Sequence, residues 1–391
     1  MTSTAARATA LPAANSYAAL PFDNPVRRLP RVPDRKRPAA FNTAFDDRTL
    51  FYDCFWHTDG TRILLVGPPW VNMEAGHRLA SYVAMPSGTK LTPRFHRSLS
   101  TMITELGGAP AGTEVVEVLF AGAKLSLVVQ PNSCRDLAGR KLLFSINKNN
   151  DLAWIREWAE FHARMHGTDA VVLVDNASTL YEPGEILATL QAVPGIAHAA
   201  VASWPYSFGP IDPAVKANPY WSRFLQIGSM SMVLRRYGEL CYGLLDCDID
   251  ELASARSGRS IYDLAHDSRG GLVAFRGTWI EAVPSGHGPH SDYSQRLSDP
   301  KKALSRQRKW ALDPSRPWVR RLSVHPYWHW IEGRAWFSKS MPDDAGYWHF
   351  KGINTNWKFQ RTAAPDGPTV EDAQLAAAMR RAGLVGPEGH R

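Results

Sequence analysis

The stretch that decides the fold is Gly243-Leu244-Leu245-Asp246-Cys247-Asp248-Ile249-Asp250-Glu251-Leu252. It ends an apolar run and brings four carboxylates within six residues, at positions 246, 248, 250 and 251. Carboxylates this close repel one another, and each is costly to desolvate unless it is paired or bound to a metal. Residues at i and i+2 of an extended chain face the same way, so Asp246, Asp248 and Asp250 can share one side. A strand that ends in such a cluster predicts a divalent cation held by oxygen ligands.

Four interpretations of this stretch compete. The first is a solvated acidic turn after a buried strand. A calcium loop of the D-x-D-x-D type fails, because Glu251 and Ser257 stand where that loop needs Gly and a bidentate Glu. A haloacid dehalogenase-like phosphatase would use Asp246 as its nucleophile, and only Asp343-Asp344 offers it a late acidic pair. The last is the D-x-D motif of a sugar-nucleotide transferase, whose carboxylates hold a metal that bridges the two phosphates of the donor.

Composition and charge narrow the class of protein. With 391 residues, of which 44% are hydrophobic and 21% charged, the chain suits a soluble globular protein of two or three domains. The net charge of +8 suits anionic ligands or an anionic membrane surface, but no dense block of Lys and Arg argues for nucleic acid.

The cellular location is predicted from the cysteines and from the apolar runs. The four cysteines are scattered without a C-x-x-C pair, which is typical of reduced thiols. The sequence contains no run of about 18 apolar residues and no convincing signal peptide. We therefore expect a cytoplasmic protein, either soluble or peripheral at the inner face of the membrane.

The domain organisation follows from shifts in composition. Residues 1–40 are rich in Ala, Pro and Arg without a sustained period, so we expect a flexible tail. Short apolar runs between turns predict a small antiparallel β accessory domain over 41–140. Residues 141–365 form the predicted catalytic domain, and residues 366–391 form a C-terminal tail with an amphipathic helix near 370–384.

From residue 141 to the acidic stretch, apolar strands alternate with helical segments. The predicted strands are 142–146, 170–174 and 196–203, and the predicted helices are 151–166, 184–191 and 222–237. This alternation predicts an α/β fold with a parallel sheet and helices on both of its faces. Ligands bind at the carboxyl ends of the strands in such sheets, where Lys148-Asn149, Asp175-Asn176 and the acidic stretch would meet.

The motifs of this region, in their order and spacing, resemble those of the GT-A glycosyltransferases, in particular family 2-like and family 92-like members. The match extends over about 141–361 and includes Lys148-Asn149-Asn150, Glu157-Trp158-Ala159-Glu160-Phe161-His162, Asp175-Asn176-Ala177-Ser178, Asp248-Ile249-Asp250-Glu251-Leu252, Trp279 with Pro284-Ser285-Gly286-His287, and Lys309-Trp310. Near the C-terminus, His349-Phe350-Lys351-Gly352, followed by Trp357, is similar to the H-F-x-G-x-x-K-P-W motif of glycogenin-like transferases. Asn150 stands where the first family usually has Glu, and Thr355-Asn356 replaces the Lys-Pro pair of the second.

The resemblance implies a GT-A-type, Rossmann-like, mostly parallel sheet flanked by helices, behind the N-terminal small β domain. It implies a metal-dependent transfer of a sugar from a nucleotide-sugar donor to a glycan or glycoconjugate acceptor, with Mn or Mg as cofactor and polysaccharide biosynthesis as the setting. Asp248, Asp250 and His349 would bind the metal. The residues that would contact the nucleotide sugar are Lys148, Asn149, Asp175, Asn176, Asp248, Lys351 and Lys358.

Transfer with inversion also needs a carboxylate that removes the proton of the acceptor hydroxyl. Glu281 and Asp292 are the candidates for this general base, and either can be an ordinary surface acid. Likewise, Asp175-Asn176 can cap a turn, and His349 can be a packed, hydrogen-bonded histidine. The alternatives to a glycosyltransferase are the phosphatase with Asp246 as nucleophile and a nucleotide- or glycan-binding protein without turnover.

Overall fold

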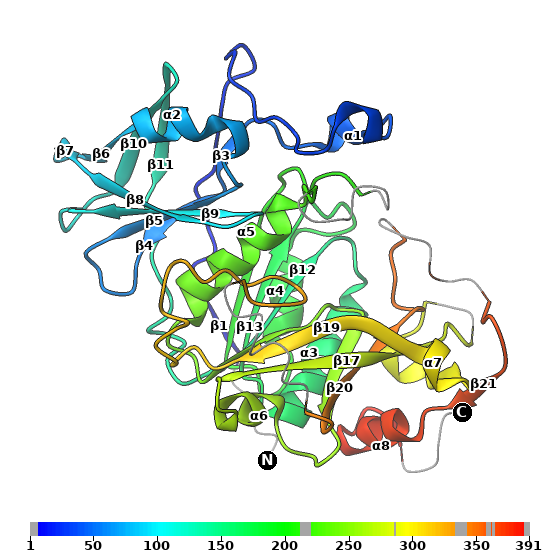
Figure 1. The fold of residues 1–391 in the computed structure, drawn as a ribbon. Coiled ribbons are helices and arrows are strands. Elements are labelled where there is room, and N and C mark those ends of the chain that lie inside the picture. The colour runs from blue at the N-terminus through cyan, green and yellow to red at the C-terminus, as the bar shows by residue number, and fades with distance from the viewer. Residues whose placement is uncertain are drawn as a thin grey trace.

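The computed structural model describes residues 7–211, 220–284, 287–332, 342–356, 361 and 364–386. These residues form an α/β structure around a nine-stranded mixed sheet that is flanked by helices (Figure 1). The strand order of this sheet is β1-β14-β13-β12-β15-β19-β17-β20-β16. Two four-stranded sheets from the N-terminal part of the chain lie at the upper left of Figure 1.

One half of the large sheet is parallel. Its strands are β1 (Thr9–Ala10), β14 (His198–Ser203), β13 (Ala170–Asp175), β12 (Lys141–Asn147) and β15 (Gly243–Asp246). Apart from β1, these strands are largely buried, because apolar cores cover both faces of the sheet. The helices α3 (Leu152–His166), α4 (Pro183–Gln191) and α6 (Ile261–Asp267) contribute to one core, and α5 (Phe224–Val233) contributes to the other.

The other half of the sheet is mainly antiparallel, so the sheet is mixed, although parallel pairings predominate in the sheet as a whole. β19 (Leu304–Leu312) runs antiparallel to β15 and to β17 (Leu272–Ile280). β20 (Ala345–Phe350) is parallel to β17, and β16 (Glu251–Ala255) ends the sheet antiparallel to β20. Since β16 follows β15 directly in the chain, the acidic residues between them connect the middle of the sheet to its edge.

The N-terminal part contains two antiparallel sheets. One sheet consists of β4 (Asp53–Trp56), β5 (Ile63–Gly67), β9 (Met102–Gly107) and β8 (Thr92–Arg97). The other consists of β11 (Ala123–Val128), β10 (Val115–Phe120), β6 (Ser81–Met85) and β7 (Thr89–Lys90). These sheets share an apolar core of their own, and the short helix α2 (Glu74–Leu79) packs against β10 through His77 and Phe120. This region therefore has the short strands and turns expected from its sequence.

Residues 7–40 do not form the flexible tail expected from their composition. β1 extends the large sheet, and β2 (Ala18–Ala19) pairs with β3 (Thr49–Phe51). The guanidinium of Arg28 is buried and donates hydrogen bonds to three backbone carbonyls, those of Asp46, Thr49 and Pro69. The segment consists of the two-residue strands β1 and β2, a short 3₁₀ turn (Asp34–Lys36) and irregular chain between them, so its buried residues follow no sustained helix or strand period. The sequence pattern therefore could not reveal its packing.

A buried ion pair connects the N-terminal part to the large sheet. Arg236 lies in the turn of π-helix that follows α5, and its Nη1 is 2.8 Å from the Asp53 carboxylate on β4. Both side chains are fully buried, and the guanidinium also donates to the carbonyls of Ala14 and Pro131. These contacts hold the N-terminal segment, β4 and the end of α5 together.

The C-terminal region returns to the large sheet. α7 (Pro300–Ala303) precedes β19, and β18 (Gln295–Leu297) pairs with β21 (Thr369–Glu371). The amphipathic helix expected there is α8 (Ala373–Arg381), which buries one face in the core that α3 shares. Among the described helices, none has both the length and the apolar character needed to cross a membrane.

Candidate functional site

Three polar strand ends meet at one edge of the large sheet, as the sequence predicts. β12, β13 and β15 are parallel neighbours, and their register pairs Asn147 with Asp175 and Phe144 with Asp246. The carboxyl ends of these strands therefore lie together. The acidic loop, defined here as residues 246–251, starts from this edge.

A lysine from β19 lies among the carboxylates of the acidic loop. The Nζ of Lys309 is 2.7 Å from Asp248 Oδ2, 3.0 Å from Glu251 Oε2 and 3.9 Å from Asp246 Oδ2. Its side chain is buried, which by itself would lower the pKa of the ammonium, but the three carboxylates outweigh burial and raise that pKa well above its usual value. Lys309 therefore supplies a permanent positive charge that stabilises the loop.

Asp246 and Glu251 are the most enclosed acids of the loop. Asp246 is fully buried, and neither of its carboxylate oxygens has a hydrogen-bond partner in the described part of the chain. Burial raises the pKa of Asp246 to about 8, although Lys309 opposes the shift. Glu251 accepts a hydrogen bond from the backbone N–H of Asp248 at 2.9 Å, and burial raises its pKa as well.

The histidine from the far end of the chain reaches the acidic loop. β20 pairs with β16 so that His349 lies opposite Glu251, and the Nε2 of His349 is 3.0 Å from Asp250 Oδ2. Trp279 stacks on the imidazole with ring centroids 3.9 Å apart. Arg361 Nη1 lies 2.7 Å from the same Asp250 oxygen and 2.8 Å from His349 Nε2.

The ionisation of this pair follows from burial and charge. Burial lowers the pKa of His349, which favours the neutral imidazole that a metal needs. Burial would raise the pKa of Asp250, but the interaction with His349, which includes a hydrogen bond, and the positive charges of Arg361 and Lys309 outweigh it and lower the pKa below its usual range. Asp250 is therefore ionised at neutral pH.

Three side chains form a group that fits a divalent cation. Asp250, Glu251 and His349 each offer one ligand atom, and these atoms lie within 4.8 Å of one another. Glu251 Oε1 and His349 Nδ1 are buried and have no hydrogen-bond partner among the described residues. Carboxylate oxygens and an imidazole nitrogen suit Mn²⁺, and the oxygens suit Mg²⁺. We call these three residues the acid–histidine cluster.

The composition of the cluster differs from the predicted ligand set. Asp250 and His349 are present, but Glu251 takes the place expected for Asp248. The Asp248 carboxylate pairs with Lys309 instead, and its side chain is 39% exposed. The sequence contained the signal for Glu251, because it is the fourth acid of the loop, but nothing in the sequence showed which acids face His349.

A cavity of about 100 Å³ adjoins the cluster. Its lining includes cationic and amide side chains, namely Lys148, Asn150, Gln226, Gln307, Asn354 and Arg361. Such groups donate hydrogen bonds to phosphate and sugar oxygens. The volume is below the roughly 300–1,000 Å³ typical of pockets for whole ligands, so it can hold a fragment of about the size of a phosphate group.

Three of the expected nucleotide-binding residues instead hold the surrounding loops. Asp175 is buried and accepts hydrogen bonds from Asn147 Nδ2 at 2.7 Å and from the Ser178 hydroxyl at 2.5 Å. Asn176 donates to the carbonyls of Trp204 and Tyr206, and the Asn149 side chain accepts from the Thr179 N–H. Lys148 alone among the expected residues of these two strand ends lines the cavity.

The remaining predicted residues lie at the margin of the site. Glu281 is fully buried, and both of its oxygens contact Lys351 Nζ, at 2.8 and 2.7 Å. The structure thus pairs a predicted base with a predicted phosphate ligand. Asp292 is exposed and does not line the cavity. Lys358 lies outside the described residues.

Buried side chains on the other side of the loop hold its backbone. His290 is fully buried, and its Nε2 is 2.8 Å from the carbonyl oxygen of Ile249. Its Nδ1 lies 3.5 Å from a carboxylate oxygen of Glu157 on α3, which also accepts from the Ser291 N–H. One turn further along α3, His162 accepts a hydrogen bond from the Ala253 N–H of β16. Contacts from α3 and from the 290–292 turn thus hold the segment that carries Asp250 and Glu251.

The sequence motifs include Lys309 and the segment from Glu157 to His162, but they did not predict a part for either in the site. Arg361 was not predicted at all. Each of them acts across more than fifty residues of sequence, so no local pattern points to its partner. A comparison of the sequence with protein-family models and with curated proteins found no match. Any functional conclusion therefore depends on the geometry of the acidic loop and on the motifs of the sequence.

Proposed function

We propose that this chain is a metal-dependent glycosyltransferase of GT-A type, which moves a sugar from a nucleotide-sugar donor to a glycan or glycoconjugate acceptor in polysaccharide assembly. The observation that carries the proposal is the acid–histidine cluster, which combines Asp250 and Glu251 with an imidazole from nearly 100 residues away. The cluster adjoins the carboxyl ends of parallel strands, the usual place for ligands in α/β sheets.

The cluster and its neighbours have the groups that loss of a diphosphate requires. A bound Mn²⁺ or Mg²⁺ would act as a Lewis acid toward the leaving phosphates, and Asp250, Glu251 and His349 would hold it. Lys148 and Arg361 line the adjacent cavity and can form charge-assisted hydrogen bonds to phosphate oxygens. Arg361 now contacts Asp250 and His349, so on donor binding its guanidinium would exchange these partners for phosphate.

The other charged residues have supporting parts in this proposal. Lys309 fixes the carboxylate of Asp248, whose side chain is 39% exposed beside the cavity, so Asp248 would help to shape the site for the donor. Glu281 is the better placed of the two candidate bases, because Trp279, two residues before it on β17, stacks on His349. To accept a proton, Glu281 would have to leave its contact with Lys351.

The geometry does not favour the phosphatase alternative. Its nucleophile, Asp246, would have to reach a substrate, yet the side chain is fully buried behind Lys309. The phosphatase would also need a late acidic residue, and the candidate Asp344 accepts hydrogen bonds from Ser257. This contact lies at one end of the β16–β20 pair, whereas His349 lies at the other end.

Release of nucleotide from a panel of UDP-, GDP- and CMP-linked sugars, with Mn²⁺ or with EDTA, tests the proposal. At least one donor should be turned over, with slow hydrolysis where no acceptor is present, and EDTA should abolish the reaction. Asp250→Asn and His349→Ala should each lower the rate by at least about a hundredfold, since even the groups that only support metal ligands are worth 10–100-fold.

Asp23→Asn, which changes an exposed acid of the N-terminal part, is the matched control and should keep full activity. Release of inorganic phosphate in place of nucleotide would favour the phosphatase. Tight binding of a nucleotide sugar without any turnover would favour a binding protein.

A further inference from the structure

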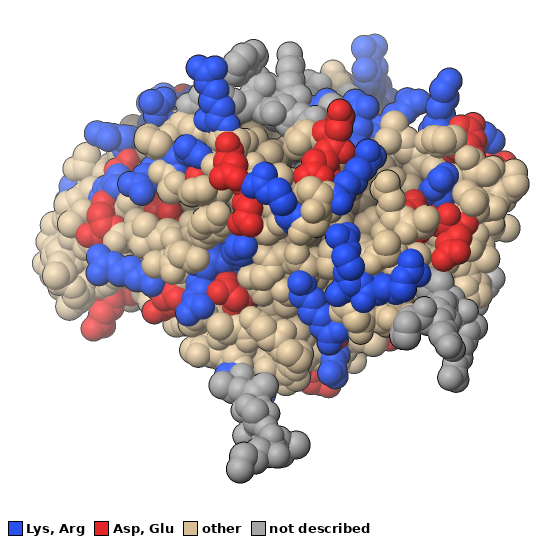
Figure 2. All heavy atoms as spheres, turned by 90° about the horizontal axis from the view of Figure 1, so that it is seen from below, with Lys and Arg blue, Asp and Glu red and all other residues tan. Residues whose placement is uncertain are grey.

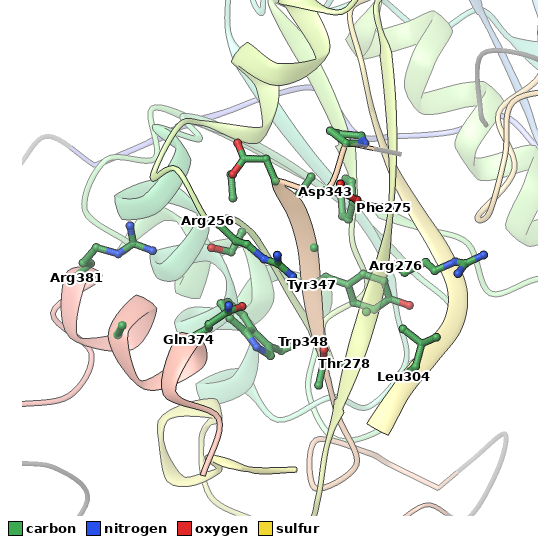
Figure 3. Close-up of a pocket in the computed structure, with 18 residues that line it drawn as sticks. Arg256, Phe275, Arg276, Thr278, Leu304, Asp343, Tyr347, Trp348, Gln374 and Arg381 are labelled. Atoms are coloured by element: carbon green, nitrogen blue, oxygen red, sulfur yellow. The ribbon is translucent and has the colours of Figure 1, made fainter. Parts of the chain in front are cut away.

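A second cavity, of about 610 Å³, lies between α8 and the strands β16, β17 and β20 (Figure 3). Its walls include the last residues of β16, residues 275–278 of β17 and residues 345–348 of β20. This volume is within the roughly 300–1,000 Å³ typical of ligand pockets. The cavity is distinct from the smaller one beside the acid–histidine cluster, and no residue lines both.

Three arginines from three different elements surround this cavity. Arg256 follows β16, Arg276 belongs to β17, and Arg381 ends α8. In Figure 3, Arg256 and Arg276 lie on opposite sides of Tyr347, and Arg381 projects from the helix. All three are exposed, and within the described part of the chain none of their guanidinium groups makes a hydrogen bond or an ion pair.

The acids near these arginines do not balance their charge. Among the described residues that line the cavity, the acids are Asp343 and Asp344, so the three guanidinium groups leave an excess of positive charge. Both carboxylate oxygens of Asp344 also accept hydrogen bonds from Ser257, one from its backbone N–H and one from its hydroxyl. Figure 2, which views the molecule from below, shows more Lys and Arg than Asp and Glu on that face. Like charges around a concave surface attract anions, because an anionic ligand relieves their mutual repulsion.

Aromatic residues fix the floor of the cavity. The hydroxyl of Tyr347 is 3.0 Å from that of Ser305, and its ring lies where a side chain at position 277 would be. A Cβ on Gly277 would approach that ring to 2.5 Å, so glycine is required there. The pairing of β17 with β19 shifts between Arg276 and Gly277. Gln374, Thr278 and the three arginines also line the cavity, and such side chains can hydrogen-bond to the hydroxyl and anionic groups of a sugar.

We propose that this cavity binds an anionic sugar chain, one that carries carboxylate or phosphate groups, and that it anchors the acceptor away from the reacting end. β17 and β20 run from the cavity to the acid–histidine cluster, and the ring centroids of Tyr347 and His349 are 6.1 Å apart. The role as acceptor site rests on the proposed glycosyltransferase function, whereas the binding of an anionic sugar does not.

Calorimetric titration of the full chain, in EDTA and without nucleotide, tests this inference independently of sugar transfer. The probes are tetragalacturonate, the neutral tetrasaccharide maltotetraose, glucose 6-phosphate, and tetraglutamate as an anionic chain without sugar. Tetragalacturonate, glucose 6-phosphate or both should bind, maltotetraose should not, and the affinity should fall with salt, because charge-assisted contacts at an open site are screened. The preferred anion distinguishes carboxylated from phosphorylated chains.

Arg276→Gln and Arg381→Gln should each weaken that binding by about tenfold or more, since each removes a charge-assisted hydrogen-bond donor. Arg94→Gln, which changes an exposed arginine on β8, is the matched control and should bind as the wild type does. Equal binding of maltotetraose, or unchanged binding in both variants, would overturn the inference. Equal binding of tetraglutamate would overturn the assignment to sugars.

Discussion

Asp246 ends β15 in a fully buried position. Among the residues that the structure describes, its two oxygens have no hydrogen-bond partner, and the ammonium of Lys309 lies 3.9 Å away. Because burial raises its pKa to about 8, the carboxyl group is mostly protonated at pH 7. Asp246→Asn should therefore change the free energy of unfolding at pH 7 by less than about 1 kcal/mol and should leave nucleotide release intact. Urea unfolding and the nucleotide-release assay measure the two effects.

Lys309→Met is the contrasting variant for this prediction. The variant removes the buried ammonium group that pairs with the carboxylates of Asp248 and Glu251. It should therefore lower the free energy of unfolding by about 3–5 kcal/mol. If Asp246→Asn instead abolished turnover while the protein stayed folded, Asp246 would be a reacting group, and the phosphatase alternative would return.

His77 on α2 gives a prediction for the dependence of stability on pH. The imidazole stacks on Trp70 with ring centroids 4.4 Å apart, and no described residue forms a hydrogen bond with either ring nitrogen. Burial, with a smaller contribution from Arg28, lowers the pKa of His77 from 6.5 to about 2. The unfolded chain therefore takes up a proton below pH 6.5 that the folded chain refuses, so stability is present above pH 6.5 and is lost as the pH falls.

His77→Phe removes this proton uptake and keeps a ring of similar shape. Between pH 6.5 and pH 5, the variant should lose about 2 kcal/mol less stability than the wild type, at about 1.4 kcal/mol per pH unit. Urea unfolding at a series of pH values measures the slope, and the two proteins should show parallel slopes above pH 7. Equal slopes below pH 6 would show that His77 gains its proton while the protein is folded.

At the scale of elements, the acidic loop depends on the helix and turn behind it. His290 is not a member of the acid–histidine cluster, but its Nε2 lies 2.8 Å from the carbonyl oxygen of Ile249. Ile249 stands between Asp248 and Asp250 in the acidic loop. His290→Phe should therefore weaken Mn²⁺ binding by about 10–100-fold, the range measured for groups that orient metal ligands. His290→Gln can still donate to that carbonyl and should recover part of the affinity.

Electron paramagnetic resonance of free Mn²⁺ gives the affinity directly, and thermal unfolding shows whether each variant is folded. A folded His290→Phe protein that binds Mn²⁺ as the wild type does would remove His290 from the account of the site.

The elements differ in how well the sequence predicted them. The strands and helices between 141 and 246 follow apolar runs and helical periods, so the predicted helix 151–166 matches α3 (Leu152–His166) closely. β19 contains Arg306, Arg308 and Lys309 among apolar residues, and β16 is a short buried strand after four acids. Their pairing depends on contacts between distant segments, which is why the antiparallel half of the sheet was not predicted.

The candidate site was predicted to the same limited extent. Asp250 and His349 were expected together, and the structure brings them to 3.0 Å. Lys309 and Arg361 were not expected there. Which basic residue lies beside a buried acid depends on how distant segments pack together, and the local sequence does not show this. Asp175 and Asn176 were expected to face a nucleotide, yet their short polar side chains satisfy loop backbone and neighbouring side chains instead.

At the scale of the whole molecule, the N-terminal segment and the C-terminal helix both pack against the large sheet. β1 pairs with β14, and the buried pair of Arg236 and Asp53 connects the two parts of the chain. We therefore expect a ligand that binds only the folded state to stabilise the large sheet and the N-terminal part together. Ligand at a hundred times its dissociation constant adds about 2.7 kcal/mol, which thermal unfolding detects as a shift of several degrees.

Thermal unfolding of the full chain with UDP-, GDP- and CMP-linked sugars, each with and without Mn²⁺, is the most direct test of the central claim. At least one nucleotide sugar should raise the melting temperature in the presence of Mn²⁺, and EDTA or Asp250→Asn should remove the shift. The same shift without metal, or in the Asp250→Asn and His349→Ala variants, would contradict a metal-dependent donor site at the acidic loop. No shift with any of these ligands would contradict it as well.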